Sequence, residues 1–240
     1  MVHELPQYLR QDPLDAAVRD ALLSGRVDDF HSASEEPGPG IFAFPLLTRS
    51  ACTDLLAEVD RRTVELTSSE SAGPNSMHDY GETLATLGMD DLSRVLRNMF
   101  TPIATRLFAD CGGSEIDGEH AFLAEYGAEF DDALGFHVDD SAVTLNVCLG
   151  ENFSGAEIYF RGMRCDLHRQ TSATPTESFE LEHEVGTALL HAGRHRHGVH
   201  PIRRGRRRNL ILWMQSSSAK RRAQACQSWC GARADSTEPR

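Results

Sequence analysis

The sequence predicts a mainly β protein with packing helices, arranged as a curled antiparallel double sheet. Short segments of strand composition, separated by turn residues, follow one another from about residue 120 to 215. Two longer segments with helical periodicity precede them, over 48–66 and 90–110. Strands behind two helices favour a double sheet covered by helices.

Length and charge limit the class of protein. The chain has 240 residues, enough for one large core and for one or two domains. A net charge of −12 argues against nucleic acid as a partner, although seven arginines crowd into residues 194–208. No signal pattern begins the sequence, and no apolar run reaches the roughly 18 residues of a membrane span. We therefore expect no membrane partner.

The first 40 residues are predicted to form a helix and a linker. Residues 12–24 have a helical pattern, with Asp12 as the capping residue and Gly25 as the stop. Residues 31–40 are rich in Ser, Gly and Pro, which is typical of a linker or loop.

Residues 41–216 are expected to form the main domain. It begins with a short strand at 41–44, and Thr48 then opens a helix that runs to about residue 66. A polar loop at 67–81 leads to the second helix at 90–110. The apolar stripes of the two helices consist of Leu55, Leu56, Val59, Val64, Leu92, Val95, Leu96, Met99, Ile103 and Leu107. Both helices are predicted to pack against the sheet.

The strands belong to a region that we define as 120–215. They are predicted at 121–126, 143–149, 155–160, 179–184, 186–191 and 209–215. Phe136 and Phe160 are predicted to be core residues. The polar segment 166–178 is predicted to be an exposed loop, and residues 217–240 a polar tail that is helical at first and then disordered.

Six cysteines are scattered over the chain: Cys52, Cys111, Cys148, Cys165, Cys226 and Cys230. None forms a Cys-x-x-Cys pair, so we expect reduced thiols in a cytoplasmic or nuclear protein. Cys226 and Cys230 could pair or bind a metal, but the sequence shows no third ligand near them.

His137 and Asp139 are the first candidate metal ligands. On a strand, residues two apart leave the same face, so their imidazole and carboxylate would share one space. A second imidazole about 60 residues later would complete the two-histidine, one-carboxylate triad that holds iron(II). The candidates for it are His191, His195, His197 and His200. In an extended segment His195 and His197 share a face, so local geometry does not separate them.

The spacing after this histidine cluster resembles a known family. Pro201, Gly205 and Arg207 follow His197 by four, eight and ten residues, and Trp213 ends an apolar run. This pattern, with His-x-Asp before it, resembles the iron(II)/2-oxoglutarate-dependent dioxygenases. More narrowly it is similar to the prolyl 4-hydroxylase-like group, and within it to the family of 2-oxoglutarate and iron-dependent oxygenase domain-containing protein 2.

The resemblance covers about 120–215 and neither residues 1–40 nor the tail. It implies a double-stranded β-helix (jelly roll) core, with His137, Asp139 and His197 as the iron ligands.

The resemblance also implies a co-substrate, 2-oxoglutarate, whose distal carboxylate needs a buried cation. A guanidinium suits a carboxylate, and spacing favours Arg207, with Arg206 as the alternative. The two side chains would leave opposite faces of a strand, so only one can enter the barrel. In similar enzymes a tyrosine at the position of Tyr126 helps to hold the co-substrate; a packed strand tyrosine is the alternative. Asn146, an amide in mid-strand, is predicted to face either the co-substrate or solvent.

The implied activity is hydroxylation of a C–H bond, with a protein prolyl or lysyl side chain as the implied substrate. The reaction would consume O2 and 2-oxoglutarate, release succinate and CO2, and use ascorbate to keep the iron reduced. The loops at 67–81 and 166–178 are candidates for selecting the substrate.

Three alternatives stay open at this point. A cupin-like or demethylase-type oxygenase would use a similar triad, but Arg207 argues against it. A zinc module built from the histidine cluster lacks both a cysteine pair and a His-Glu-x-x-His helix. An inactive metal-binding or protein-interaction module with the same fold is the third.

Overall fold

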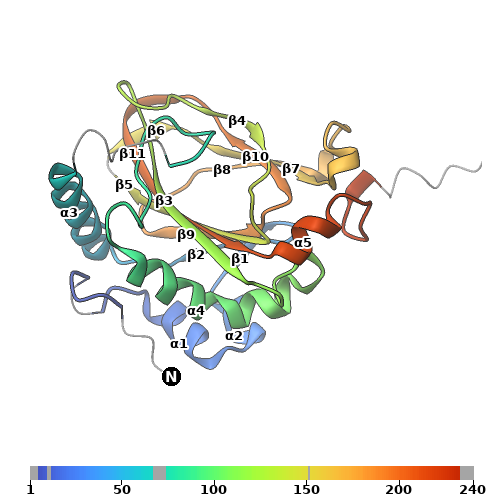
Figure 1. The fold of residues 1–240 in the computed structure, drawn as a ribbon, viewed down its shortest axis with the longest axis horizontal. Coiled ribbons are helices and arrows are strands. Elements are labelled where there is room, and N and C mark those ends of the chain that lie inside the picture. Colours follow the sequence, from blue (N-terminus) through green and yellow to red (C-terminus); the bar gives the residue numbers. More distant parts are fainter. Residues whose placement is uncertain (1–4, 10–11, 67–73, 151, 233–240) are drawn as a thin grey trace, which may run out of the picture.

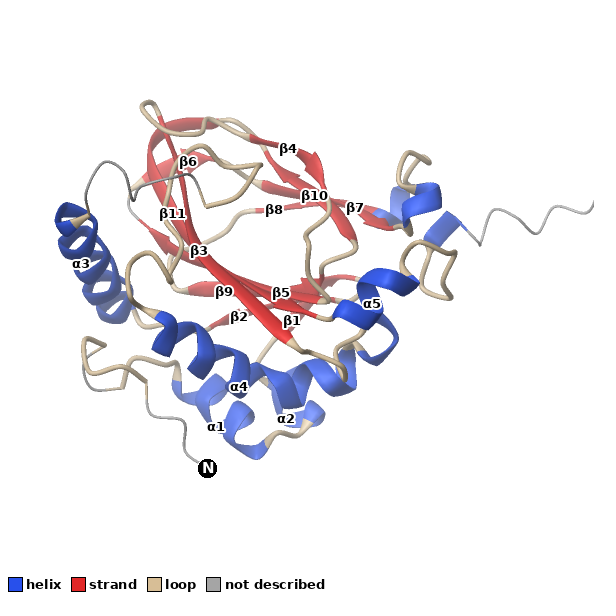
Figure 2. Ribbon diagram, in the orientation of Figure 1, coloured by secondary structure: helices blue, strands red, loops and turns tan. Residues whose placement is uncertain are grey.

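The computed structural model describes residues 5–9, 12–66, 74–150 and 152–232. Two curled antiparallel sheets face each other, and α1, α2 and α4 lie along the outer side of the larger sheet (Figures 1 and 2). The predicted antiparallel double sheet with packing helices is therefore confirmed. Among the described residues, no helix combines the length and the apolar character needed to cross a membrane.

The larger sheet has the strand order β1-β2-β9-β5-β11-β3, with β6 beside β11. These strands are β1 (Glu35–Gly38), β2 (Ile41–Pro45), β3 (Gly118–Gly127), β5 (Val143–Gly150), β6 (Phe153–Gly155), β9 (Thr187–Ala192) and β11 (Ile202–Gln215). The smaller sheet has the order β4-β10-β7-β8, formed by β4 (Leu134–His137), β7 (Ile158–Met163), β8 (Ser178–Leu181) and β10 (His195–Val199).

Alternation along β11 divides the core into two clusters. Leu210 and Leu212 pack with the helices on one face of the larger sheet, whereas Ile211 and Trp213 belong to the cluster between the two sheets. This is the period of two that strand geometry imposes. The strand predicted at 209–215 is correct but too short, because the arginine-rich segment before it continues the ladder with β3.

The two predicted helices are confirmed as α3 (Arg49–Glu65) and α4 (Asp90–Leu107). The hydroxyl of Thr48 accepts a hydrogen bond from the N–H of Ala51 and so caps α3. Val64 is 86% exposed, so its assignment to the apolar stripe is wrong.

The N-terminal region is more ordered than its composition suggests. Helix α1 (Ala16–Ser24) is capped by Asp15 rather than Asp12, and Gly25 ends it with φ at 62°. The predicted linker at 31–40 is wrong, since it contains the end of α2 (Val27–Ser32) and the whole of β1. Phe30 in α2 is fully buried in the same core as α4.

Local backbone features explain the remaining differences. The strand predicted at 155–160 is divided into β6 and β7 by Ala156, which has φ at 57°. The loop 166–178 is mostly exposed, as predicted, and contains two 3-10 turns, Asp166–His168 and Pro175–Glu177. After β11 the chain forms α5 (Ser217–Arg222) and then packs residues 223–232 back against the β7 end.

Phe160 is fully buried, as expected of a core residue. Phe136 is 47% exposed, so its assignment to the core is wrong. Residues 67–73 of the predicted loop and 233–240 of the predicted tail lie outside the described residues.

Candidate metal centre and co-substrate site

His137, Asp139 and His197 converge beside a small cavity that residues of both sheets line. His137 is the last residue of β4 and pairs directly with His197 of β10. Asp139 Oδ1 lies 3.4 Å from His137 Nε2 and 3.7 Å from His197 Nε2. One ligand atom from each residue lies within 4.8 Å of the other two. The three side chains therefore form a group of the size that can hold one metal ion.

Backbone carbonyl groups fix both imidazole rings. His137 Nδ1 lies 2.7 Å from the Gly135 carbonyl oxygen, and His197 Nδ1 lies 2.8 Å from that of His195. Because a carbonyl can only accept, each Nδ1 carries the proton and donates it. Each Nε2 then offers its lone pair towards Asp139, which is the tautomer that a metal requires.

A hydroxyl relay orients the carboxylate. Thr144 donates a hydrogen bond of 2.6 Å to Asp139 Oδ2, and the Ser141 hydroxyl lies 2.7 Å from that of Thr144. Asp139 Oδ1 is thereby left to face the two imidazoles. Thr144 comes from β5, so the larger sheet holds the acid while the smaller sheet carries the histidines.

Neighbouring groups and burial shift the pKa values of Asp139 and His197. Burial raises the pKa of Asp139, but the nearby imidazoles of His197 and His137 outweigh it and lower this pKa below its ordinary value. Burial lowers the pKa of His197 to about 3, so this imidazole is neutral at neutral pH. A carboxylate beside a neutral imidazole suits a divalent cation.

The rival histidines do not join this group. His191 Nδ1 lies 2.9 Å from the Ala192 carbonyl oxygen, and its ring lies 5.0 Å from that of His197. His200 is paired with Glu180 at 3.2 Å near the surface. Within the described ranges, the groups able to hold a metal do not include His191, His195 or His200. The zinc module proposed from the histidine cluster is therefore not formed.

A small cavity between the sheets adjoins the triad. Its walls include Tyr126, Asn146 and Trp213 as well as the three ligands. Asn146 thus faces the interior rather than solvent. The indole N–H of Trp213 is buried without a hydrogen-bond partner among the described residues, which leaves one donor for a molecule in the cavity.

Tyr126, from β3 of the larger sheet, contacts His78. The Tyr126 hydroxyl is 3.3 Å from His78 Nε2, and His78 Nδ1 is 3.1 Å from Asn75 Oδ1. An amide oxygen only accepts, so Nδ1 holds the proton and Nε2 accepts from the tyrosine. Burial lowers the pKa of His78 to about 4, which keeps this ring neutral.

Arg207 points into the barrel and Arg206 points away from it. Arg207 is fully buried, and its guanidinium carbon lies 5.7 Å from the centre of the Tyr126 ring. Arg206 forms an ion pair with Glu125 on the outer face. Two adjacent residues of one strand have opposite orientations, as expected from the pleat.

Buried polar groups hold the Arg207 side chain. It donates to Asn209 Oδ1 at 2.8 Å and to His183 Nδ1 at 2.9 Å, and it also contacts the Ala156 carbonyl. His183 in turn donates from Nε2 to the Thr187 carbonyl at 2.9 Å. Burial, followed by the charge of Arg207, lowers the pKa of His183, so the ring is a neutral acceptor.

Comparison with known proteins shows what this chain is similar to. Residues 2–113 match the family model of the OGFOD2-like domain. This chain carries an OGFOD2-like domain. It is 42% identical over 217 residues, 88% of the chain, to an Arabidopsis thaliana protein named 2-oxoglutarate and iron-dependent oxygenase domain-containing protein CP2. Over 203 residues, 84% of the chain, it is 36% identical to the human 2-oxoglutarate and iron-dependent oxygenase domain-containing protein 2.

The chain spans about half the length of these relatives, covering 55% of each. The match to the OGFOD2-like domain begins at residue 2, so the expectation that the likeness excludes residues 1–40 is wrong.

A solved structure resembles the fold. It is a Trichoplax adhaerens prolyl hydroxylase in complex with a peptide fragment of the hypoxia inducible factor oxygen degradation domain. The two chains superpose with a TM-score of 0.52 and 14% identity, over 90% of this chain and 98% of the other. At this identity the likeness concerns the fold alone, and it confirms the predicted jelly-roll core.

Several polar residues of the OGFOD2-like chain's site were not predicted. Thr144, His183 and Asn209 each bond to a predicted residue, yet each lies in a segment whose composition indicates only a strand. The one sequence signal that could have found any of them concerns Asn209, which lies two residues from Arg207 and therefore shares its strand face. His78 lies in a predicted loop, and no local pattern connects it to Tyr126.

Proposed function

We propose that this chain is an iron(II)- and 2-oxoglutarate-dependent dioxygenase that hydroxylates a prolyl or lysyl side chain of a protein. In the overall reaction 2-oxoglutarate loses CO2 and becomes succinate. One oxygen atom of O2 enters succinate and the other enters the new hydroxyl group. The observation that carries the proposal is the convergence of two Nε2 lone pairs and one carboxylate oxygen at His137, His197 and Asp139.

The donor set fits the proposed metal. Two imidazoles and one carboxylate form the arrangement that holds iron(II) on one face and leaves the other positions open for co-substrate and O2. When bound, the iron supplies the oxygen chemistry of the reaction. Backbone carbonyl groups keep both histidines in the Nδ1-protonated tautomer, and the hydrogen bond from the Thr144 hydroxyl orients the Asp139 carboxylate. Ascorbate is the reductant that we expect to keep the metal as iron(II).

Three residues are proposed to bind 2-oxoglutarate. Arg207 is the cation for the distal carboxylate, because it is buried within the barrel while Arg206 is paired outside it. Tyr126 and Asn146 line the cavity beside the metal ligands. The Asn146 amide nitrogen offers a donor, and the Tyr126 hydroxyl would donate to the co-substrate in place of His78. Neutral His183 supports this role, since a neutral acceptor positions the guanidinium and leaves its charge uncancelled.

A protein substrate is favoured by the surface around the centre. Phe136, next to His137, is 47% exposed on β4, which is an edge strand of the smaller sheet. The guanidinium of Arg196 lies 5.4 Å from the centre of its ring. Because adjacent residues of a strand point to opposite faces, Phe136 lies on the outer face of the smaller sheet, where its ring offers an apolar contact for a peptide that runs along this edge strand. The solved prolyl hydroxylase with the similar fold is itself bound to a peptide. The loops 67–81 and 166–178 are proposed to select the substrate.

Succinate formation tests the proposal. The purified chain is incubated with iron(II), 2-oxoglutarate and ascorbate, and succinate is measured beside His197→Ala and the matched control His200→Ala. We expect iron-dependent succinate that disappears in His197→Ala and persists in His200→Ala. Binding of iron and of 2-oxoglutarate is measured in parallel by calorimetry without O2, because turnover in the absence of the protein substrate can be slow. Failure to bind either one would favour an inactive module of the same fold.

A further inference from the structure

Four residues far from the iron ligands in sequence converge at the end of β7. Cys165, His168, Cys226 and Cys230 each place one ligand atom within 4.8 Å of the other three. Cys165 Sγ lies 3.2 Å from His168 Nδ1, and Cys230 Sγ lies 3.5 Å from the same nitrogen. We propose that this cluster is a structural zinc site with three thiolates and one imidazole.

The distances suit a tetrahedral ion. Zinc bonds of about 2.3 Å to sulfur and about 2.0 Å to nitrogen place neighbouring sulfur and nitrogen ligands of a tetrahedral ion about 3.5 Å apart. The two observed sulfur–nitrogen separations are 3.2 and 3.5 Å. Hydrogen bonds from the thiols would account for these two contacts, but they do not require Cys226 to join the group. Convergence of all four side chains is what a four-coordinate ion requires.

Local structure prepares one half of the site. Cys165 directly precedes the 3-10 turn Asp166–His168, so it stands three residues before His168. Residues three apart in a 3-10 turn lie on the same side, which directs the thiol and the imidazole to one point. This Cys-x-x-His spacing is of the type that supplies two zinc ligands from one turn.

The segment after α5 brings the other half. The N–H of Asp166 donates to the Ala223 carbonyl at 3.0 Å, which joins this segment to the turn after β7. Trp229 donates from its indole nitrogen to the Asp110 carbonyl at 3.2 Å. Cys230, within the same segment, is buried.

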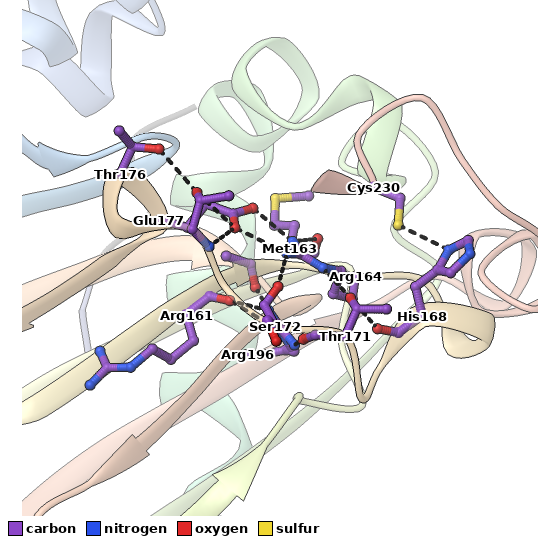
Figure 3. Close-up of polar contacts among 12 residues, drawn as sticks. Arg161, Met163, Arg164, His168, Thr171, Ser172, Thr176, Glu177, Arg196 and Cys230 are labelled. Carbon is purple, nitrogen blue, oxygen red and sulfur yellow. Dashed lines mark hydrogen bonds and ion pairs between the residues drawn. The ribbon is translucent and has the colours of Figure 1, made fainter. Parts of the chain in front are cut away.

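A buried ion pair supports the turn beside the cluster (Figure 3). Arg164 is 1% exposed and donates to both carboxylate oxygens of Glu177, at 2.7 and 3.0 Å. It also donates to Thr171 Oγ1 at 2.8 Å. A Cβ at Gly231 would collide with both Arg164 and Glu177, so the backbone after Cys230 approaches this pair closely.

Zinc is favoured over iron at this position. Thiolate ligands select zinc, whereas a carboxylate with two imidazoles suits iron(II). All four ligand positions are occupied by protein side chains, which is the closed arrangement of a structural ion. The six cysteines are all unpaired, so the sulfur atoms are available.

The site would fasten the C-terminal segment to the barrel. Ala223, Gln227 and Trp229 form part of the wall of a cavity of about 430 Å³ that extends to Asp139. A zinc ion bound to Cys226 and Cys230 on one side and Cys165 on the other would hold this wall in place. The inference is independent of the proposed oxygenase activity, because no residue of the cluster is an iron ligand.

Metal analysis tests the site on the full chain, purified under reducing conditions without chelator or histidine tag. We expect one zinc ion per chain, lost in Cys226→Ser and His168→Ala. His168→Cys should retain it, because a fourth thiolate replaces the imidazole, and Cys111→Ser is the matched cysteine control. After replacement by cobalt(II), the wild type should show thiolate-to-cobalt charge-transfer absorption, which the iron centre cannot produce because it has no sulfur ligand.

Two results would overturn the proposal. One is a reduced protein without zinc and without the cobalt–thiolate absorption. The other is a disulfide among the three cysteines, detected by mass spectrometry after alkylation of free thiols. Retention of zinc in both Cys226→Ser and His168→Ala would likewise reject this ligand set. Because His168→Cys keeps four ligands, misfolding of the other variants cannot be mistaken for support.

Discussion

His137 and His197 are direct partners across β4 and β10, and their ring centres are 4.3 Å apart. Each ring is held through Nδ1 by a carbonyl two residues before it in its own strand. The two ligand histidines are therefore oriented by the same backbone device on neighbouring strands. The smaller sheet therefore places the two imidazoles side by side, and Asp139 supplies the negative charge of the ligand set.

Asp139→Ala should abolish iron binding. Without the carboxylate, two neutral imidazoles hold a hard divalent cation poorly. Calorimetry with iron(II) in the absence of O2 measures the affinity. Asp140→Ala is the matched control, since Asp140 pairs with Lys220 outside the centre. Unchanged iron affinity in Asp139→Ala would refute the triad.

Thr144→Val should weaken iron binding by roughly 10–100-fold, the usual effect of removing a group that orients a ligand. Valine has nearly the shape of threonine but lacks the hydroxyl that bonds Asp139 Oδ2. Thr144→Ser keeps the hydroxyl and should restore most of the affinity. If valine and serine behaved alike, the orienting role of Thr144 would be wrong.

Arg207→Ala should raise the concentration of 2-oxoglutarate required for succinate formation by roughly 10–100-fold, as expected for one charged hydrogen-bonding group. Arg206→Ala should change it little, because this side chain pairs with Glu125 on the outer face. Arg207→Lys keeps the charge without the planar donors and should lie between the two. The opposite ranking of the alanine variants would transfer the role to Arg206.

Glu177→Gln should reduce stability at neutral pH and lose this effect in acid. The hydrogen bond from Arg164 lowers the pKa of Glu177 from 4.5 to about 2. A carboxyl with a lowered pKa in the folded state contributes stability above its unfolded value, and this contribution disappears as pH falls from about 4.5 towards 2. We expect a difference on the order of 1 kcal/mol at pH 7, allowing for solvent screening.

Urea unfolding at several pH values measures this difference. Glu184→Gln is the matched control, because Glu184 is exposed and lies outside the Arg164 network. A wild-type minus Glu177→Gln difference that stayed constant from pH 7 to pH 3 would show that the charge of Glu177 is not the cause.

Local pattern predicted much of the fold because strand and helix periods depend on neighbouring residues. Thr48 and Gly25 were correct as helix boundaries, since capping is a local interaction. The linker predicted at residues 31–40 was wrong because that prediction rested on their Gly and Pro content. The structure of this region depends instead on burial of the neighbouring Phe30 against α4. Val64 fits the helical period of the apolar stripe, but its side chain is exposed to solvent.

The sequence by itself determined which residues share a strand face. The opposite orientation of Arg206 and Arg207 follows from the pleat alone. Asp139 was expected to share a strand face with His137, but β4 ends at His137 and Asp139 lies beyond it. Tertiary structure decided which distal histidine meets Asp139, because that depends on the register between β10 and β4. It also brought Cys165 and His168 to Cys226 and Cys230, about 60 residues later in the chain. These long-range contacts form because the strands and the C-terminal segment bury their apolar surfaces together. No local period of the sequence encodes such contacts.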